Sequence, residues 1–164
     1  MKNERSSLLR DKKGVDRYLL FILLGIGLIW LKSGLGKLAM GNFADTLGGT
    51  LVKFMAKNPY PWFVDFINSW VLPSSSMWGL VVMTSEALAG ILITFAALAL
   101  MFVGGNEKRL VWALKVGIII GFGLSLMFLL AAGWTSPSTD GLNQLMLVVE
   151  GIGVIYAWSL LKKS

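Results

Sequence analysis

Four long apolar stretches divide the chain, and polar residues gather between them. The last three stretches hold a single charged residue each, and the first, uncharged from residue 18 to 31, continues through Lys32 and Lys37. A helix needs about 20 apolar residues to cross the roughly 30 Å core of a bilayer. A soluble bundle would need polar faces on these segments, and they have almost none. The pattern therefore predicts an all-α fold, an integral membrane four-helix bundle forming a single domain. The predicted spans are residues 17–40, 77–103, 111–132 and 142–161.

The long connection 41–76 between the first two spans predicts two short amphipathic helices on the outer side of the membrane. Apolar residues recur at helical spacing on both sides of an Asn-Pro-Tyr-Pro break at residues 58–61. Trp62, Phe66 and Trp70 form an apolar stripe in the second helix and are candidate lid residues. Two interpretations remain open, a cover over the helix ends and a lid over a cavity between the helices.

The distribution of basic residues predicts the orientation. One side of the predicted membrane receives eleven Lys and Arg residues, from the tail 1–16, from Arg17, from the turn near residue 108 and from the C-terminus, and the other receives four. Basic residues favour the cytoplasmic side, so we expect a plasma membrane protein with both termini in the cytoplasm. The net charge of +6 then follows from topology, and no nucleic-acid partner is expected.

The sequence contains no Cys and no His. This excludes a thiol nucleophile, a disulfide, an iron–sulfur cluster and a thiolate zinc site, and it excludes His-ligated haem. Any redox role must therefore use a bound cofactor or a partner protein. No catalytic residue can be assigned from the sequence.

Charged residues inside the predicted spans are the candidate site. Lys32, Glu86 and Glu150 all lie roughly 12–14 Å below the predicted outer boundary, at about 1.5 Å per residue. An ionised group near the bilayer centre costs about 2.5–3.5 kcal/mol on insertion scales, so we expect these side chains to turn inward and pair. Lys37 is about 140° around the helix from Lys32, so only one of the two lysines can face the interior. Asn143 shares the stripe of Glu150 and is a further candidate.

These residues allow two interpretations, a ligand or proton site and a structural Lys–Glu pair that fixes the register of the helices. Separately, Gly117 and Gly121 form a small-residue motif that favours close packing, either within the bundle or between two copies of the chain.

Several blocks together resemble the DoxX/DoxD family of small four-helix membrane proteins. They are Gly34-Leu-Gly-Lys-Leu38 with Asn42-Phe-Ala44, Asn58-Pro-Tyr-Pro-Trp62 with Val71-Leu-Pro73, Glu86-x-x-x-Gly90, and Gly133-Trp-x-x-Pro137 leading to Asn143. The blocks cover residues 17 to 160, with Arg17 at the position where the family often has a basic residue. Lys32 and Glu150 do not match recognised family positions.

The resemblance implies an integral membrane subunit. One branch of the family is associated with thiosulfate:quinone oxidoreductase, in which a DoxD-type subunit works beside a DoxA-type partner. A quinone would suit Glu86, Lys37 and Trp62, which offer proton donors, an acceptor and an aromatic ring. The alternative is a non-redox membrane protein that binds or carries a small molecule or lipid, or that acts as an assembly subunit.

Overall fold

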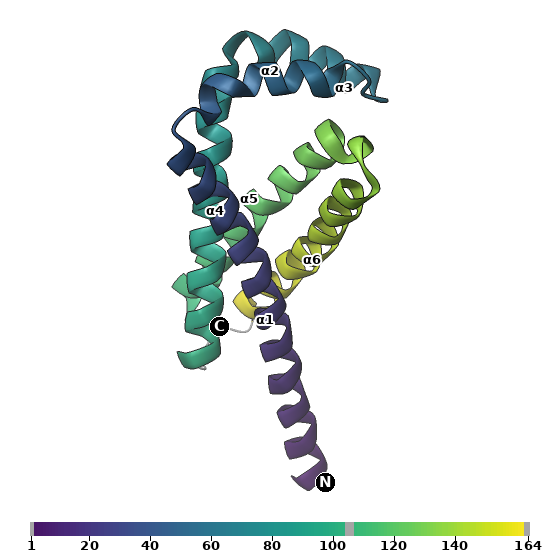
Figure 1. Ribbon diagram of the computed structural model, residues 1–164. Helices are drawn as coiled ribbons and strands as arrows, with labels where there is room; N and C mark the ends of the chain where they lie inside the picture. Colours follow the sequence, from purple (N-terminus) through teal and green to yellow (C-terminus); the bar gives the residue numbers. More distant parts are fainter. Residues whose placement is uncertain (1, 104–106, 163–164) are drawn as a thin grey trace.

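The computed structural model describes the backbone of residues 2–103 and 107–162, and the side chains of residues 17–102 and 107–162. The predicted basic side chains before Arg17, and Lys163, lie outside the described residues. Every element in the described part is helical (Figure 1). In chain order the elements are α1 (Lys2–Met40), α2 (Phe43–Met55), α3 (Pro61–Phe66), a π-helical turn (Ile67–Val71), a 3-10 turn (Leu72–Ser74), α4 (Ser75–Val103), α5 (Lys108–Ala132), a 3-10 turn (Gly133–Thr135) and α6 (Pro137–Leu161).

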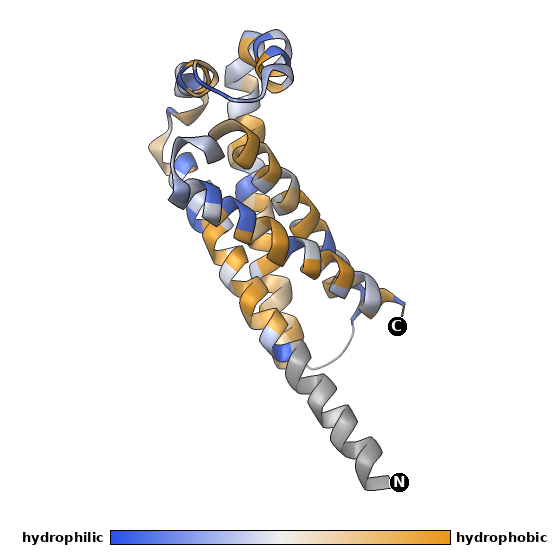
Figure 2. Cartoon of the chain, turned by 90° about the vertical axis from the view of Figure 1, so that its right-hand side faces the viewer, coloured by the Kyte–Doolittle hydropathy of each residue, from blue (hydrophilic) through white to orange (hydrophobic). Residues whose placement is uncertain are grey.

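Four segments in the described part are long and apolar enough to cross a membrane. They are Arg17–Met40, Pro61–Phe102, Lys108–Thr135 and Pro137–Leu161. Figure 2 shows apolar residues along the coloured part of the first helix and along much of the other long helices. Large apolar side chains such as Phe21, Phe95 and Ile155 are exposed on these helices, as expected where lipid is the solvent. The prediction of an all-α membrane bundle is confirmed at this level.

The centre of the bundle is a continuous apolar core formed by α1, α4, α5 and α6. Leu23, Ile93, Leu114 and Ile118 are fully buried in it. The helix faces that carry the two carboxylates, Glu86 and Glu150, also face inward, because Ala89, Ala97, Gly153 and Ala157 beside them are buried. Small residues on these stripes allow the helices to approach closely.

Helices α1 and α4 pack backbone against backbone. A Cβ added at Gly34 would lie 2.7 Å from the Ala87 Cα atom, and one added at Gly90 would lie 2.5 Å from the Leu31 Cα atom. Glycine at these two positions is therefore required by the approach of the neighbouring chain. Helix α1 ends at Met40 because Gly41 adopts a φ of 71°, in the left-handed region that commonly terminates helices.

The last helix begins earlier than the sequence pattern predicts. The apolar pattern predicts a start at Leu142, whereas α6 starts at Pro137. The Ser136 hydroxyl caps the helix by accepting a hydrogen bond from the Thr139 N–H. Pro137 suits the first helical position because it has no backbone N–H that would need an acceptor. The apolar pattern misses residues 137–141 because this boundary is determined by capping and not by apolar periodicity.

Helices α2 and α3 lie across one end of the other helices (Figure 1). Their inner side forms a second apolar cluster with the end of α5, built from Leu51, Met55, Phe63, Ile67, Val71 and Ala131. The Asn58 side chain joins this region to α5, because its Nδ2 donates to the Leu130 carbonyl oxygen over 2.8 Å and its Oδ1 accepts from the Tyr60 N–H. The connection between α1 and α4 is thus a packed structure.

The contact between α1 and α4 predicts that alanine substitution destabilises the bundle at one glycine of α1 and not at another. Gly34→Ala should lower the stability of the bundle by about 1–3 kcal/mol, because its methyl group would meet the backbone of α4. Gly25→Ala is the matched control, because a Cβ there meets nothing within 4 Å. Thermal unfolding of both variants in the same detergent tests this, and equal midpoints would contradict the packing.

Candidate functional site

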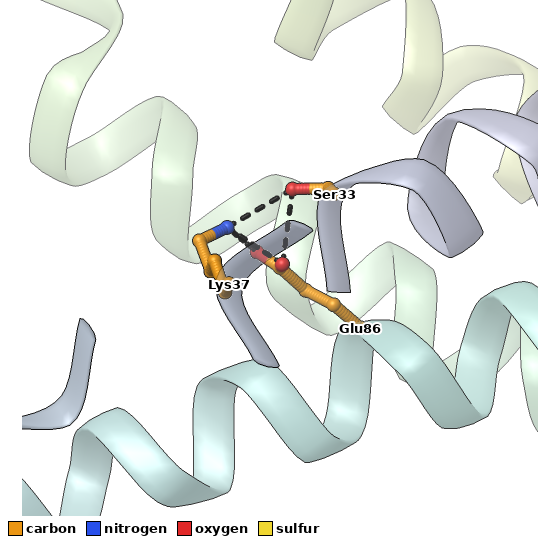
Figure 3. A network of polar contacts seen from close by, with 3 residues as sticks. All are labelled: Ser33, Lys37 and Glu86. Atoms are coloured by element: carbon orange, nitrogen blue, oxygen red, sulfur yellow. Dashed lines mark hydrogen bonds and ion pairs between the residues drawn. The ribbon is translucent and has the colours of Figure 1, made fainter. Parts of the chain in front are cut away.

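An ion pair joins α1 to α4 near the end that α2 and α3 cover. Lys37 Nζ lies 2.5 Å from Glu86 Oε1 and 2.6 Å from Oε2, so the ammonium bridges both carboxylate oxygens. The Ser33 hydroxyl, one turn before Lys37, donates to Glu86 Oε2 over 3.0 Å and accepts from Lys37 over 3.0 Å. Figure 3 shows the three side chains closing a small network.

The two members of the pair differ in exposure. The Glu86 side chain is 0% exposed, whereas that of Lys37 is 20% exposed. Two aromatic rings flank the ammonium, with centroids 5.1 Å away for Phe43 of α2 and 5.6 Å away for Phe128 of α5. A partly accessible cation beside aromatic rings, backed by a buried anion, is suited to bind a polar head group on an apolar molecule.

A second buried carboxylate lies deeper in the bundle and has neutral partners. Glu150 of α6 is fully buried. Its Oε1 accepts a hydrogen bond of 2.7 Å from the Trp30 indole N–H, and its Oε2 accepts one of 2.8 Å from the Ser125 hydroxyl. Among the side chains that the structure describes, none forms a salt bridge with Glu150. Gly121 makes room for this group, because a Cβ there would lie 2.5 Å from Glu150 Oε1.

The Phe128 ring lies near one partner of each carboxylate group. Its centroid is 5.9 Å from that of Trp30, which holds Glu150, and 5.6 Å from the Lys37 ammonium, which holds Glu86. Both polar groups therefore share one aromatic neighbour from α5. We treat Trp30, Ser33, Lys37, Glu86, Phe128 and Glu150, with Phe43 and Ser125, as the candidate site.

The structure brings only some of the predicted residues together. Lys37 and Glu86 pair directly, whereas the Lys32 side chain is exposed and turned away from them. Of Lys32 and Lys37, the inward one is thus Lys37. Asn143 is buried, but its amide donates to the Thr139 carbonyl oxygen of its own helix. Lys32, Glu86 and Glu150 do not form a single cluster.

The three predicted lid residues share one face, and this face is exposed. Trp62 is 61% exposed and Trp70 is 73% exposed, with Phe66 less so. The residues that pack toward α5 are instead their neighbours Phe63 and Ile67. The residue of this region that contacts the site is Phe43, at the start of α2.

Five residues of the site were not predicted from the sequence: Trp30, Ser33, Phe43, Ser125 and Phe128. Trp30 could have been found, because it is a Trp inside a predicted span, away from the membrane boundaries where this residue is expected. Ser33 and Lys37 lie three and seven residues after Trp30, on the same helical stripe. Ser125 and Phe128 carry no signal, because a Ser or Phe in an apolar span is common in any membrane helix.

The glycine motif on α5 is used inside the molecule. A Cβ at Gly117 would lie 2.9 Å from Leu92 and Ile93 side-chain atoms of α4, and Gly121 faces Glu150. The sequence left open whether this motif packs within the bundle or between two copies of the chain, and in the structure it packs within the bundle. In the described part of the chain, no group of three Asp or Glu side chains could hold a metal ion.

The fold and the site define a class, a multi-pass membrane protein with paired polar groups inside its helical bundle. Comparison with known proteins adds no relative, because no family model, no curated protein and no solved structure matches the chain. The resemblance to the DoxX/DoxD family therefore remains a prediction from the sequence.

The ion pair predicts a large difference between two lysines of α1. Lys37→Met should destabilise the protein by about 3 kcal/mol, because it leaves the Glu86 carboxylate buried with Ser33 as its remaining donor. Lys32→Met, which removes an exposed lysine, should change stability by less than about 0.5 kcal/mol.

Replacing both partners provides a control. The double variant Lys37→Met with Glu86→Leu should recover much of the loss, because no unpaired charge remains. Chemical unfolding in one detergent compares all four proteins. Equal losses for the Lys37 and Lys32 variants would show that the pair does not stabilise the bundle.

Proposed function

We propose that this protein is a quinone-interacting subunit of a membrane oxidoreductase, of the DoxX/DoxD kind and similar to thiosulfate:quinone oxidoreductase. The observation that carries the proposal is the partly accessible Lys37 ammonium, which lies between the Phe43 and Phe128 rings and against the buried Glu86 carboxylate. Carbonyl oxygens accept hydrogen bonds from an ammonium, and flat rings stack on aromatic side chains.

The residues of the site fit a quinone in both of its protonation states. Lys37 would donate to a carbonyl oxygen of the oxidised ring, and Glu86 would accept from a hydroxyl of the reduced ring. Ser33 contacts both and would hold their geometry. A bound quinone would take up two electrons and two protons. Since the chain has no Cys and no His, the electrons would come from a partner subunit, such as a DoxA-type protein.

The orientation belongs to the same proposal. With both termini in the cytoplasm of a plasma membrane protein, α2, α3 and the Lys37 site lie toward the outer side. The exposed Trp62, Phe66 and Trp70 would then lie in the outer interface, where aromatic side chains are favoured. In this arrangement α2 and α3 are a lid of which Phe43 is the part that contacts the site.

A non-redox function is the second candidate. It is favoured because both carboxylate oxygens of Glu86 already accept hydrogen bonds from Lys37 or Ser33, so Glu86 needs no ligand. The protein would then bind a lipid or another small molecule, or would act as an assembly subunit. Purification with a bound lipid, together with normal quinone turnover in a deletion strain, would favour this candidate.

The quinone proposal predicts a difference between two phenylalanines of α5. Purified protein should release quinone on solvent extraction, and Phe128→Leu should retain about two- to tenfold less, because an aromatic pair is worth about 0.5–1.5 kcal/mol. Phe122→Leu is the matched control, because Phe122 is exposed on the same helix. Quinone chromatography and reduction of added quinone by thiosulfate are the measurements. Absence of quinone from repeated wild-type extractions, with no such reduction, would sink the proposal.

The orientation is tested separately with topology reporters. A reporter that is active only in the cytoplasm should be active when it is fused after Lys163, because eleven basic residues are predicted on the side of the termini. A reporter inserted at Asn58, between α2 and α3, should report the opposite side. A periplasmic or extracellular C-terminus would overturn the orientation and leave the quinone test unaffected.

A further inference from the structure

A buried lysine lies at the end of the bundle opposite α2 and α3, where α5 begins and α6 ends (Figure 1). Lys115 of α5 is only 8% exposed. Its ammonium lies 4.7 Å from the centroid of Trp112 and 4.0 Å from that of Trp158 on α6. The two indoles therefore hold the cation between the two helices.

This cation has no anionic partner in the part of the chain that the structure describes. The salt bridge described there is that of Lys37 with Glu86, far from Lys115 along the bundle, and no hydrogen bond from Lys115 is present among the described residues. The indole N–H groups of Trp112 and Trp158 likewise donate to no described residue, whereas those of Trp30 and Trp134 do. Cation–π contact stabilises the ammonium, whose three N–H donors have no acceptor among the described residues.

The surroundings of Lys115 are basic. The Lys162 ammonium lies 5.9 Å from the same Trp158 ring. Lys108 and Arg109 begin α5 and are exposed, and Glu107 is the acidic residue next to them. Among the described residues, positive charge thus exceeds negative charge around the two indoles, which favours an anionic ligand.

The depth of the group identifies the source of the anion. Lys115 is seven residues into α5, or about 10 Å along the helix, and a long lysine side chain on a helix points back toward the N-terminus. Its ammonium is thereby brought toward the level of lipid head groups. Trp112 and Trp158 are both 52% exposed, as expected for indoles in contact with a bilayer interface.

We propose that Lys115, Trp112 and Trp158, with Lys162 at the rim, bind the phosphate group of an anionic phospholipid between α5 and α6. The ammonium and the two indole N–H groups supply donors to the phosphate oxygens, and the exposed apolar sides of the helices accommodate the acyl chains. The site is distant from Lys37 and does not depend on the proposed quinone function.

The test uses the full-length protein in detergent, titrated with short-chain phosphatidylglycerol, with phosphatidylcholine of the same chain length and with inorganic phosphate at equal ionic strength. The rise in the thermal unfolding midpoint measures binding. We expect phosphatidylglycerol alone to stabilise the wild type. Lys115→Gln should need roughly tenfold or more lipid for the same shift, because it loses a charge-assisted hydrogen bond. Lys115→Arg should bind like the wild type, since a guanidinium also stacks on indoles and binds phosphate.

The matched control is Lys53→Gln, which removes one exposed lysine from α2 at the other end and should titrate like the wild type. Trp158→Leu keeps all charges and should weaken the phosphatidylglycerol response several-fold, so it tests the site even where Lys115→Gln fails to fold. Equal responses to phosphatidylglycerol and phosphatidylcholine, or an equal response to inorganic phosphate, would overturn the proposal. So would unchanged titrations for both Lys115→Gln and Trp158→Leu.

Discussion

The ion pair between Lys37 and Glu86 is the interaction on which the arrangement of the helices depends. Glu86 lies in an apolar bundle that offers no water to its carboxylate, so its partners must come from a neighbouring helix. Lys37 and Ser33 can reach it because Gly34 lets the backbone of α1 touch α4 at Ala87. The pair thereby fixes both the register and the rotation of α1. Once Lys37 faces inward, Lys32 must face outward.

One polar stripe on α1 serves both buried carboxylates. Trp30 donates to Glu150, while Ser33 and Lys37 donate to Glu86. The two carboxylates are held differently, one by a cation and the other by an indole and a hydroxyl. Phe128 contacts the partners of both, so a ligand or a substitution at this ring would affect both groups.

The two ends of the bundle are built for different surroundings. At one end, α2 and α3 form an apolar cluster beneath an exposed face of Trp62, Phe66 and Trp70. At the other end, basic residues surround a lysine held between two indoles. Aromatic residues are thus present at both ends of the described bundle, where the interfaces of a bilayer favour them.

The sequence by itself determined the class of the fold, because membrane spans follow from the length of apolar runs such as 77–103. It also determined that Glu86 and Glu150 face inward, because a charged side chain inside an apolar span is costly unless it turns toward the interior of the bundle. It did not determine the start of α6, where the hydroxyl of Ser136 and the ring of Pro137 decide, or the choice between Lys32 and Lys37. Only the tertiary structure decided which lysine pairs with Glu86 and that Glu150 is held by Trp30 and Ser125. The physical reason is that helical periodicity fixes which residues of one helix share a face. The rotation and register of two packed helices depend instead on close contacts between them, such as that of Gly34 with Ala87, and these contacts form only in the packed structure.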